Sequence, residues 1–345
     1  MTETLPLLLK GAPGSPYTRK MLALLRYRRI PYRLVISGSA AAEPLPRPKV
    51  ELLPTFYFPA ADGGLEPVTD SSPLLRRFER SLPGRAVRPA DPALAWLDSL
   101  LEDYADEWLT KAMFHYRWHY AADIAKAGNI LPRWRRPTAS EAEIAEADRA
   151  FSRRQIDRLY VVGSNERTWA TIEASYRRFL AAFDHALQRH PFLMGARPGA
   201  SDFAAYGQLT QLAHFDPTPA ALTLAEAPRV HAWVDLVDDL SGLEPADAHW
   251  LGREAAAEAL SPLLREIART YQPVMLANAR ALMAGASEVH AEVEGVTWVQ
   301  QAFPYQGKCL RWLREEHAAL GAADRAWVDG LLQAQGCAAL VQAKP

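Results

Sequence analysis

The chain has 345 residues, about half of them apolar, and its 39 basic and 40 acidic residues give a formal net charge of −1. This length suggests two or three domains, and the balanced charge argues against nucleic acid and anionic membranes as partners. The sequence contains no apolar run long enough to span a membrane and no N-terminal leader pattern, so we expect a cytoplasmic protein.

The first 85 residues alternate between predicted strands and helices. Leu5 to Lys10 is a short apolar run ended by glycine and proline, which is typical of a buried strand. Ser15 then stands where an N-cap belongs, and Pro16 where a helix begins. Helical spacing of apolar residues extends this helix to about Arg29.

The next segments predict the rest of a small sheet. A strand is expected over 32–36, followed by an Ala-, Gly- and Pro-rich segment over 37–48 that is too irregular for a full helix. Residues 50–58 are typical of a strand, but Pro54 restricts it to a sheet edge or a special turn. A turn at Asp62–Gly63–Gly64 and a short strand over 65–68 complete a hairpin, and a helix begins at 70–73.

From about residue 91 the pattern becomes helical, with apolar residues at helical spacing. Two apolar stripes are formed by Leu94, Leu97, Leu101, Tyr104 and Trp108, and by Ile172, Tyr176, Phe179, Phe183 and Leu187. The segment 192-FLMGARPGASDFAAYGQL-209 follows the second stripe and belongs to this helical part.

About 100 residues follow Ser241. In them we predict a helix opened by Ser261–Pro262, extended structure over 288–299, and helices within 303–320 and 323–334. No low-complexity linker precedes this segment, so we expect it to pack on the helical part. It contains both cysteines, Cys309 and Cys337, whose separation fits no zinc or redox motif.

Taken together, 15-SPYTRK-20, 53-LP-54 and 70-DS-71, in this order and spacing, make residues 1–240 resemble the cytosolic glutathione transferases. The resemblance implies a thioredoxin-like α/β domain at 1–85, an all-α domain at 91–240, and a mostly helical extension at 241–345 packed on it. It also implies glutathione as co-substrate, a small-molecule electrophile as partner, and a homodimer. Within 192–209 the resemblance implies a helix with Asp202 as a buried acid near its start and with Gly199 as the N-cap, where the family usually has Ser or Thr.

The resemblance assigns a role to each motif. The Ser15 hydroxyl, at a helix N-terminus that favours anions, would stabilise the glutathione thiolate. Leu53, before a cis Pro54, would pair with the cysteinyl backbone. Ser71 would hold the γ-glutamyl carboxylate, and Asp70 would face its ammonium. The alternatives are that Ser15 and Asp70–Ser71 only cap helices and that Pro54 is an ordinary trans edge proline.

Other candidate residues carry weaker signals. Arg47 and Lys49 are candidates for the glycyl carboxylate of glutathione by position alone. His115 and His119 have the i, i+4 spacing of metal ligands, but no third ligand is evident and packing is the alternative. The basic run 133-RWRR-136 is expected to be a solvated loop before a helix capped by Ser140.

Two functions stay open on the sequence. The first is a serine-type glutathione transferase that catalyses conjugation, ether cleavage, dehalogenation or isomerisation. The second is a non-catalytic glutathione-binding or scaffold protein on the same fold. Serine in place of the first cysteine of a CPYC-like motif argues against thiol–disulfide exchange, because serine cannot form a mixed disulfide.

Overall fold

The computed structural model describes residues 3–342. Its N-terminal part is a four-stranded sheet with the order β2-β1-β3-β4. The strands are β1 (Leu7–Gly11), β2 (Tyr32–Ile36), β3 (Thr55–Pro59) and β4 (Leu65–Val68). β1 is parallel to β2 and antiparallel to β3, which pairs with β4 as a hairpin. This mixed sheet confirms the predicted thioredoxin-like α/β fold.

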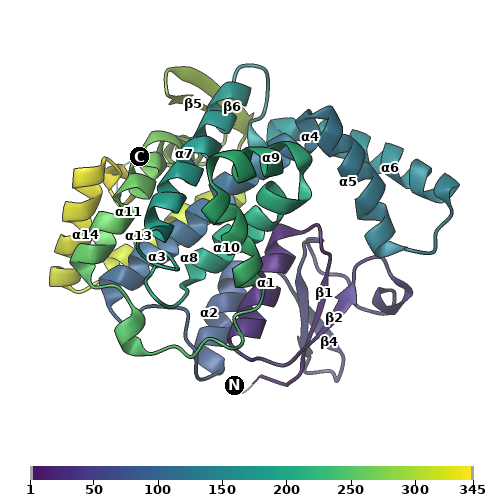
Figure 1. The fold of residues 1–345 in the computed structure, drawn as a ribbon, viewed down its shortest axis with the longest axis horizontal. Helices are drawn as coiled ribbons and strands as arrows, with labels where there is room; N and C mark the ends of the chain where they lie inside the picture. The colour runs from purple at the N-terminus through teal and green to yellow at the C-terminus, as the bar shows by residue number, and fades with distance from the viewer. Residues whose placement is uncertain (1–2, 343–345) are drawn as a thin grey trace.

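Two helices cover the face of this sheet that is turned toward the rest of the molecule (Figure 1). They are α1 (Pro16–Tyr27), which is capped by Ser15 as predicted, and α2 (Ser71–Ser81). The predicted strand over 50–58 begins only at Thr55, because residues 50–54 lead into the sheet as loop. Segment 37–48 contains only a short turn of helix at Ala40–Ala42, as its composition indicated.

The helical part begins with α3 (Pro92–Tyr104), which continues through a π-helical segment at Ala105–Leu109 into α4 (Thr110–His119). Both predicted apolar stripes are buried. The remaining helices are α5 (Ala121–Arg135), α6 (Glu141–Ile156), α7 (Trp169–Leu187), α8 (Ala200–Leu209), α9 (Pro217–Glu226) and α10 (Pro228–Asp238). Figure 1 shows that the α5–α6 hairpin projects from the body beside the sheet.

The start of α8 has the predicted form. Gly199 is the N-cap, and the buried Asp202 carboxylate accepts hydrogen bonds from the backbone N–H groups of Gly199 and Leu193, both at 2.8 Å. Glycine is required here, since a Cβ on it would lie 2.4 Å from the Asp98 carboxylate.

The C-terminal segment packs on the helical part, as expected. It contains α11 (Arg253–Glu266), α12 (Gln272–Met283), the hairpin of β5 (Glu288–Val293) and β6 (Val296–Gln301), α13 (Pro304–Ala318) and α14 (Ala322–Gln335). The prediction of a helix start at Ser261–Pro262 is wrong, because α11 already begins after Gly252 and carries Pro262 in its interior. The Ser261 hydroxyl instead donates to the carbonyl of Ala257, one turn earlier.

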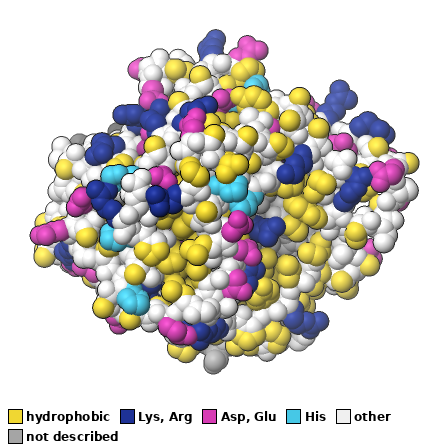
Figure 2. All heavy atoms as spheres, viewed as in Figure 1, with side chains coloured by type: hydrophobic (Ala, Val, Ile, Leu, Met, Phe, Trp, Pro, Cys, Tyr) yellow, Lys and Arg dark blue, Asp and Glu magenta, His cyan; other side chains and the backbone are white. Residues whose placement is uncertain are grey.

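Side chains of both charges are interspersed over the face shown in Figure 2. Within residues 3–342, none of the helices combines the length and the apolar character needed to cross a membrane. Both cysteines, Cys309 and Cys337, are buried and unpaired with each other.

Candidate functional site

Three loops meet at one end of the four-stranded sheet. β1 leads into the loop that carries Ser15, Leu53–Pro54 lies just before β3, and Asp70 follows β4. Phe56 of β3 lies opposite Val68 of β4, so continuing this antiparallel register by two residues places Pro54 opposite Asp70. The sheet topology therefore brings the three predicted motifs together at one end of the sheet.

Ser15 makes two hydrogen bonds at this end of the sheet. Its Oγ accepts from the Thr18 N–H at 3.2 Å, which caps α1, and donates to the Leu53 carbonyl at 3.2 Å. The Leu53–Pro54 peptide bond is cis, as the resemblance implies. The hydroxyl thus does more than cap the helix, since it also bridges the first two motifs.

Asp70 has an unusual backbone conformation for a residue with a side chain, with φ at 87°. Such conformations persist only where surrounding contacts hold them, and they concentrate at functional sites. Although Asp70 occupies the N-cap position of α2, its side chain makes no capping bond. Its carboxylate instead accepts a hydrogen bond from the Tyr305 hydroxyl of α13 at 2.7 Å. The capping alternative for Asp70 is therefore wrong.

A buried lysine, which the sequence analysis did not identify, supports the start of α2. The Lys20 ammonium is fully buried and lies 2.7 Å from Glu102 Oε1 and 2.5 Å from Asp106 Oδ2. It also lies 3.4 Å from the Ser71 hydroxyl. This network ties α1, the start of α2 and the α3 region together directly behind the Asp70–Ser71 loop.

Burial and charge perturb the groups of this network. Burial opposes the charge on Lys20, but the two carboxylates prevail and raise its pKa. For two further acids next to the network, burial outweighs the neighbouring donors, which include the buried Lys111 beside Glu107. Burial raises the pKa of Asp103 to about 7 and, helped by the neighbouring carboxylates, that of Glu107 to about 8. Both acids therefore take up protons at a higher pH than an exposed carboxyl does.

Tyr17, the nearest alternative hydroxyl to Ser15 in the sequence, is engaged elsewhere. Its hydroxyl donates to the backbone carbonyl of Asp106 at 2.8 Å. Arg47 and Lys49 are both exposed, and Arg47 lies 3.8 Å from Glu51. The roles of Arg47 and Lys49 at the glycyl carboxylate stay predictions.

The histidine pair of α4 forms a packed polar cluster. His115 is buried, with Nδ1 at 2.8 Å from the Ser164 hydroxyl and Nε2 at 3.2 Å from the Glu173 carboxylate, and its ring stacks on that of His119. Burial lowers the pKa of His115 to about 4. Over residues 3–342 no group of three His, Cys, Asp or Glu side chains is placed to bind a metal ion. These contacts favour the packing alternative.

The basic run 133-RWRR-136 is helical through Arg135, so the prediction of a loop there is wrong. Arg133 contacts Asn129 one turn earlier and Glu141 of α6, which lets α5 continue to Arg135. The predicted cap of the next helix is correct, since Ser140 and Glu143 form a capping box at the start of α6.

A cavity of about 610 Å³ lies between α5, α6 and the Gly38 loop. Most of its lining is aliphatic or aromatic, with Arg135, Arg136, Glu143 and Glu146 among the polar members. One lining residue, Leu131, also packs against the Ser15 loop. Its side chain is so close to Gly14 that a Cβ added to this glycine would lie 2.4 Å from the leucine. The Trp134 ring lies against the same glycine, so side chains of α5 separate the cavity from the Ser15 loop.

Comparison with protein families gives two matches. Residues 9–86 match the glutathione S-transferase N-terminal domain, and residues 138–236 match the glutathione S-transferase C-terminal domain. Together the matches take up just over half of the chain, in the order found in the family. No curated protein sequence matches the chain.

Comparison with solved structures gives similar folds. One is a glutathione S-transferase of Methylobacterium radiotolerans in complex with glutathione sulfonate, with 20% identity and a TM-score of 0.41, covering 70% of this chain and 92% of the other. Another is a Tau class glutathione S-transferase of mango, with 18% identity and a TM-score of 0.40, covering 73% and 96%. A third is a glutathione transferase of Burkholderia graminis with two glutathione molecules bound per subunit, with 14% identity and a TM-score of 0.40, covering 74% and 87%.

Proposed function

The chain belongs to the glutathione S-transferase family, and from that premise we propose that it is a glutathione-dependent transferase of the serine type. Glutathione binds at the end of the sheet where the three motifs meet, in the domain formed by residues 1–85. The helical domain at 91–240 and the extension at 241–345 enclose it. The observation that carries the proposal is the convergence of Ser15, cis Leu53–Pro54 and Asp70–Ser71 at this end of the sheet.

In the proposed complex, each motif contacts a different part of glutathione. The backbone of Leu53 pairs with the cysteinyl residue, Ser71 binds the γ-glutamyl carboxylate, and Asp70 faces the γ-glutamyl ammonium. The Leu53 carbonyl now accepts from Ser15 Oγ at 3.2 Å. A cysteinyl N–H donating to that carbonyl would release the serine hydroxyl to turn toward the sulfur.

The proposed role of Ser15 is to stabilise the glutathione thiolate. Its hydroxyl stands at the N-terminus of the twelve-residue helix α1, where unpaired N–H groups and the helix dipole favour an anion. A hydrogen bond to a charged group is worth about 1.5–3 kcal/mol. One pKa unit corresponds to about 1.36 kcal/mol, so Ser15 accounts for a lowering of the thiol pKa by about one to two units.

We place the electrophile in the cavity between α5 and α6, which is largely apolar and adjoins the Ser15 loop. Attack of the thiolate there would serve conjugation, ether cleavage, dehalogenation or isomerisation. The alternative is a non-catalytic glutathione-binding or scaffold protein. It is favoured by the fact that the Ser15 hydroxyl already has an acceptor within the protein.

The test is Ser15→Ala, compared with Ser39→Ala. Ser39 also donates to a backbone carbonyl, that of Ile36 at 2.7 Å, in the loop after β2. Calorimetry measures glutathione binding, thiolate absorbance against pH measures the pKa of the bound thiol, and turnover is followed with a reactive aromatic halide. We expect Ser15→Ala to raise the thiol pKa and to lower turnover about ten- to a hundred-fold, with glutathione affinity within a few-fold.

The outcomes separate the two functions. Unchanged turnover in Ser15→Ala would leave Ser15 as a helix cap, and a loss of equal size in Ser39→Ala would indicate a general effect on the fold. Glutathione binding by the wild type without turnover of any electrophile would support the scaffold function. No glutathione binding at millimolar concentration would exclude the transferase and leave the scaffold protein as the alternative. Ser15→Cys should add thiol-transfer activity, because cysteine forms the mixed disulfide that serine cannot.

A further inference from the structure

The first turn of α13 lies against the Asp70 loop, although 235 residues separate Tyr305 from Asp70. The Tyr305 hydroxyl donates to Asp70 Oδ1 at 2.7 Å, and the Lys308 ammonium lies 3.8 Å from Asp70 Oδ2. Both oxygens of this carboxylate therefore face groups supplied by the C-terminal segment. The predicted ligand-binding loop is shared between the two ends of the chain.

Contacts farther along α13 fix its position. The Trp96 indole N–H of α3 donates to the Leu313 carbonyl at 2.9 Å. Glu316 forms ion pairs with Arg76 of α2 at 2.9 Å and with Arg88 at 3.1 Å. α13 is thus attached to both the α/β part and the helical part, so Tyr305 and Lys308 occupy defined places.

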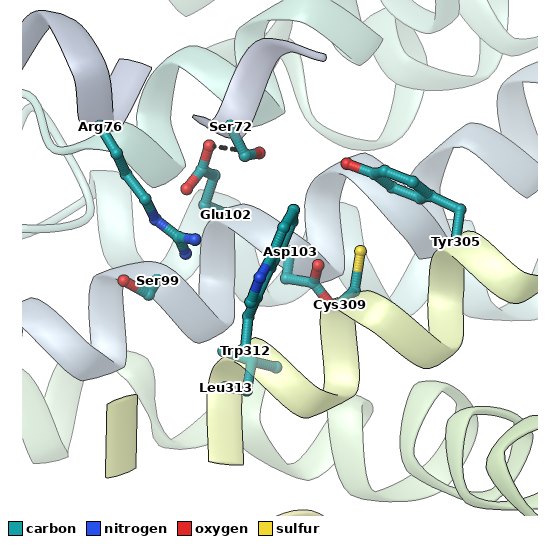
Figure 3. A pocket seen from close by; sticks show the side chains of 9 residues that line it. All are labelled: Ser72, Arg76, Ser99, Glu102, Asp103, Tyr305, Cys309, Trp312 and Leu313. Atoms are coloured by element: carbon teal, nitrogen blue, oxygen red, sulfur yellow. Dashed lines mark hydrogen bonds between the residues drawn. The ribbon is translucent and has the colours of Figure 1, made fainter. Parts of the chain in front are cut away.

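Figure 3 shows side chains of α2, α3 and α13 converging between these helices. They enclose a cavity of only about 10 Å³, lined in part by Ser72, Asp103, Tyr305 and Cys309. This volume is about that of one water molecule. The space beside Ser72 at the start of α2 therefore has no room for a ligand larger than water.

Lys308 lies beside the Asp70 carboxylate and is partly exposed to solvent. Its side chain is 42% exposed, and its ammonium lies 4.3 Å from the centre of the Trp312 ring and 5.6 Å from that of Tyr305. Cation–π contacts of this kind hold a lysine in place while leaving donors free for a ligand. Next to it stand the Asp70 carboxylate and Ser71 at the N-terminus of α2.

We propose that Lys308 of the C-terminal segment adds a contact to the α-carboxylate at the zwitterionic end of the ligand, the end that the proposed function already assigns to Asp70 and Ser71. Asp70, held by Tyr305, binds the ammonium, while Lys308 and Ser71 bind the α-carboxylate. This inference rests on the proposed function, in which that end is the γ-glutamyl residue of glutathione. It assigns to the C-terminal segment a direct part in substrate recognition.

The test uses ligands that lack one charge each. 4-Aminobutyryl-cysteinylglycine lacks only the α-carboxylate of glutathione, and glutaryl-cysteinylglycine lacks only the α-amino group. Affinities of the full-length wild type and Lys308→Met are measured by calorimetry. We expect the substitution to weaken glutathione and the glutaryl analogue about three- to ten-fold, and to leave the 4-aminobutyryl analogue within two-fold.

Two control variants complete the design. Arg311→Met removes an exposed cation from the same helix, where it lies 3.6 Å from Glu315, and should change none of the affinities. Lys308→Arg keeps the charge and should bind glutathione nearly as the wild type does. Melting curves confirm that each variant is folded, which is expected for substitutions at exposed positions.

The results distinguish this inference from the proposed function. If the wild type binds glutathione and Lys308→Met binds it equally well, or loses all three ligands to the same extent, Lys308 does not recognise the carboxylate and the proposed function still stands. If the wild type does not bind glutathione, both proposals fail. Selective loss of the two ligands that carry the α-carboxylate supports the inference.

Discussion

Replacing Lys20 with methionine should strongly destabilise the protein in a pH-dependent way. The lysine is fully buried and compensates two buried carboxylates, Glu102 and Asp106, at 2.7 and 2.5 Å. Methionine fills a similar volume but leaves both acids without a counter-ion. Removing one partner of a buried ion pair costs about 3–5 kcal/mol, which is a large part of the stability of a typical domain.

The pH dependence follows from the acids that remain. Burial already raises the pKa of Asp106 to about 6 beside Lys20, whereas the pKa of Glu102 is lowered because Lys20 outweighs burial there. Without Lys20, the pKa of both carboxyls rises, and both then lie above the values of about 3.9 and 4.3 that they have in an unfolded chain. A group whose pKa is raised by folding is neutral in both states at low pH, so the loss of stability is smallest there. The loss grows as the pH rises through the raised values, because the folded state then holds protons that the unfolded state releases.

The assay is urea unfolding of the wild type and Lys20→Met at pH 5 and pH 8. We expect a deficit of about 3–5 kcal/mol at pH 8 and a clearly smaller one at pH 5. The variant Lys20→Met/Glu102→Gln/Asp106→Asn removes all three charges and should recover much of the loss. A deficit below about 1 kcal/mol, the value of an exposed pair, or one independent of pH, would refute this account of the network.

Three further expectations concern other parts of the molecule. Because burial raises the pKa of Glu107 to about 8, its contribution to stability falls as the pH rises from about 4 to 8; Glu107→Gln should therefore flatten the decline in melting temperature between pH 5 and 9, and an unchanged slope would contradict this. A Cβ on Gly207 would lie 2.5 Å from the Pro16 carbonyl, so Gly207→Ala should destabilise the chain by about 1–3 kcal/mol, whereas Gly330→Ala, with open space around it, should not. The resemblance predicts a homodimer, which sedimentation at micromolar concentration would reveal as twice the chain mass of 38.3 kDa; a monomer alone would count against it.

The elements that sequence alone predicted are those with short-range signals. Ser15–Pro16 starts a helix through two neighbouring residues, and the hairpin around Gly63–Gly64 has its own turn signal. Pro262 shows the limit of such signals, because a proline preceded by serine resembles a helix start but lies inside α11. Only the surrounding packing decides between the two.

The sequence predicts the three motifs of the candidate site, but not the residues that hold these motifs in place. Lys20 and Glu102 are charged residues on helices, a pattern typical of solvated faces, and 82 residues separate them. Their burial together depends on how two domains pack. The same holds for Tyr305, which nothing near it in the sequence links to Asp70. Local patterns carry no information on contacts of this length.

The contact between Asp70 and Tyr305 also sets an order in the making of the protein. A ribosome adds about 5–20 residues per second, so the 235 residues between these two positions take roughly 10–50 s to appear. Throughout that interval the α/β part can fold, but the Asp70 loop lacks its cover and Arg76 lacks its partner Glu316. A nascent chain that stops before α13 would contain Ser15, Asp70 and Ser71 but lack Tyr305 and Lys308, the two groups that contact the Asp70 carboxylate in the full chain.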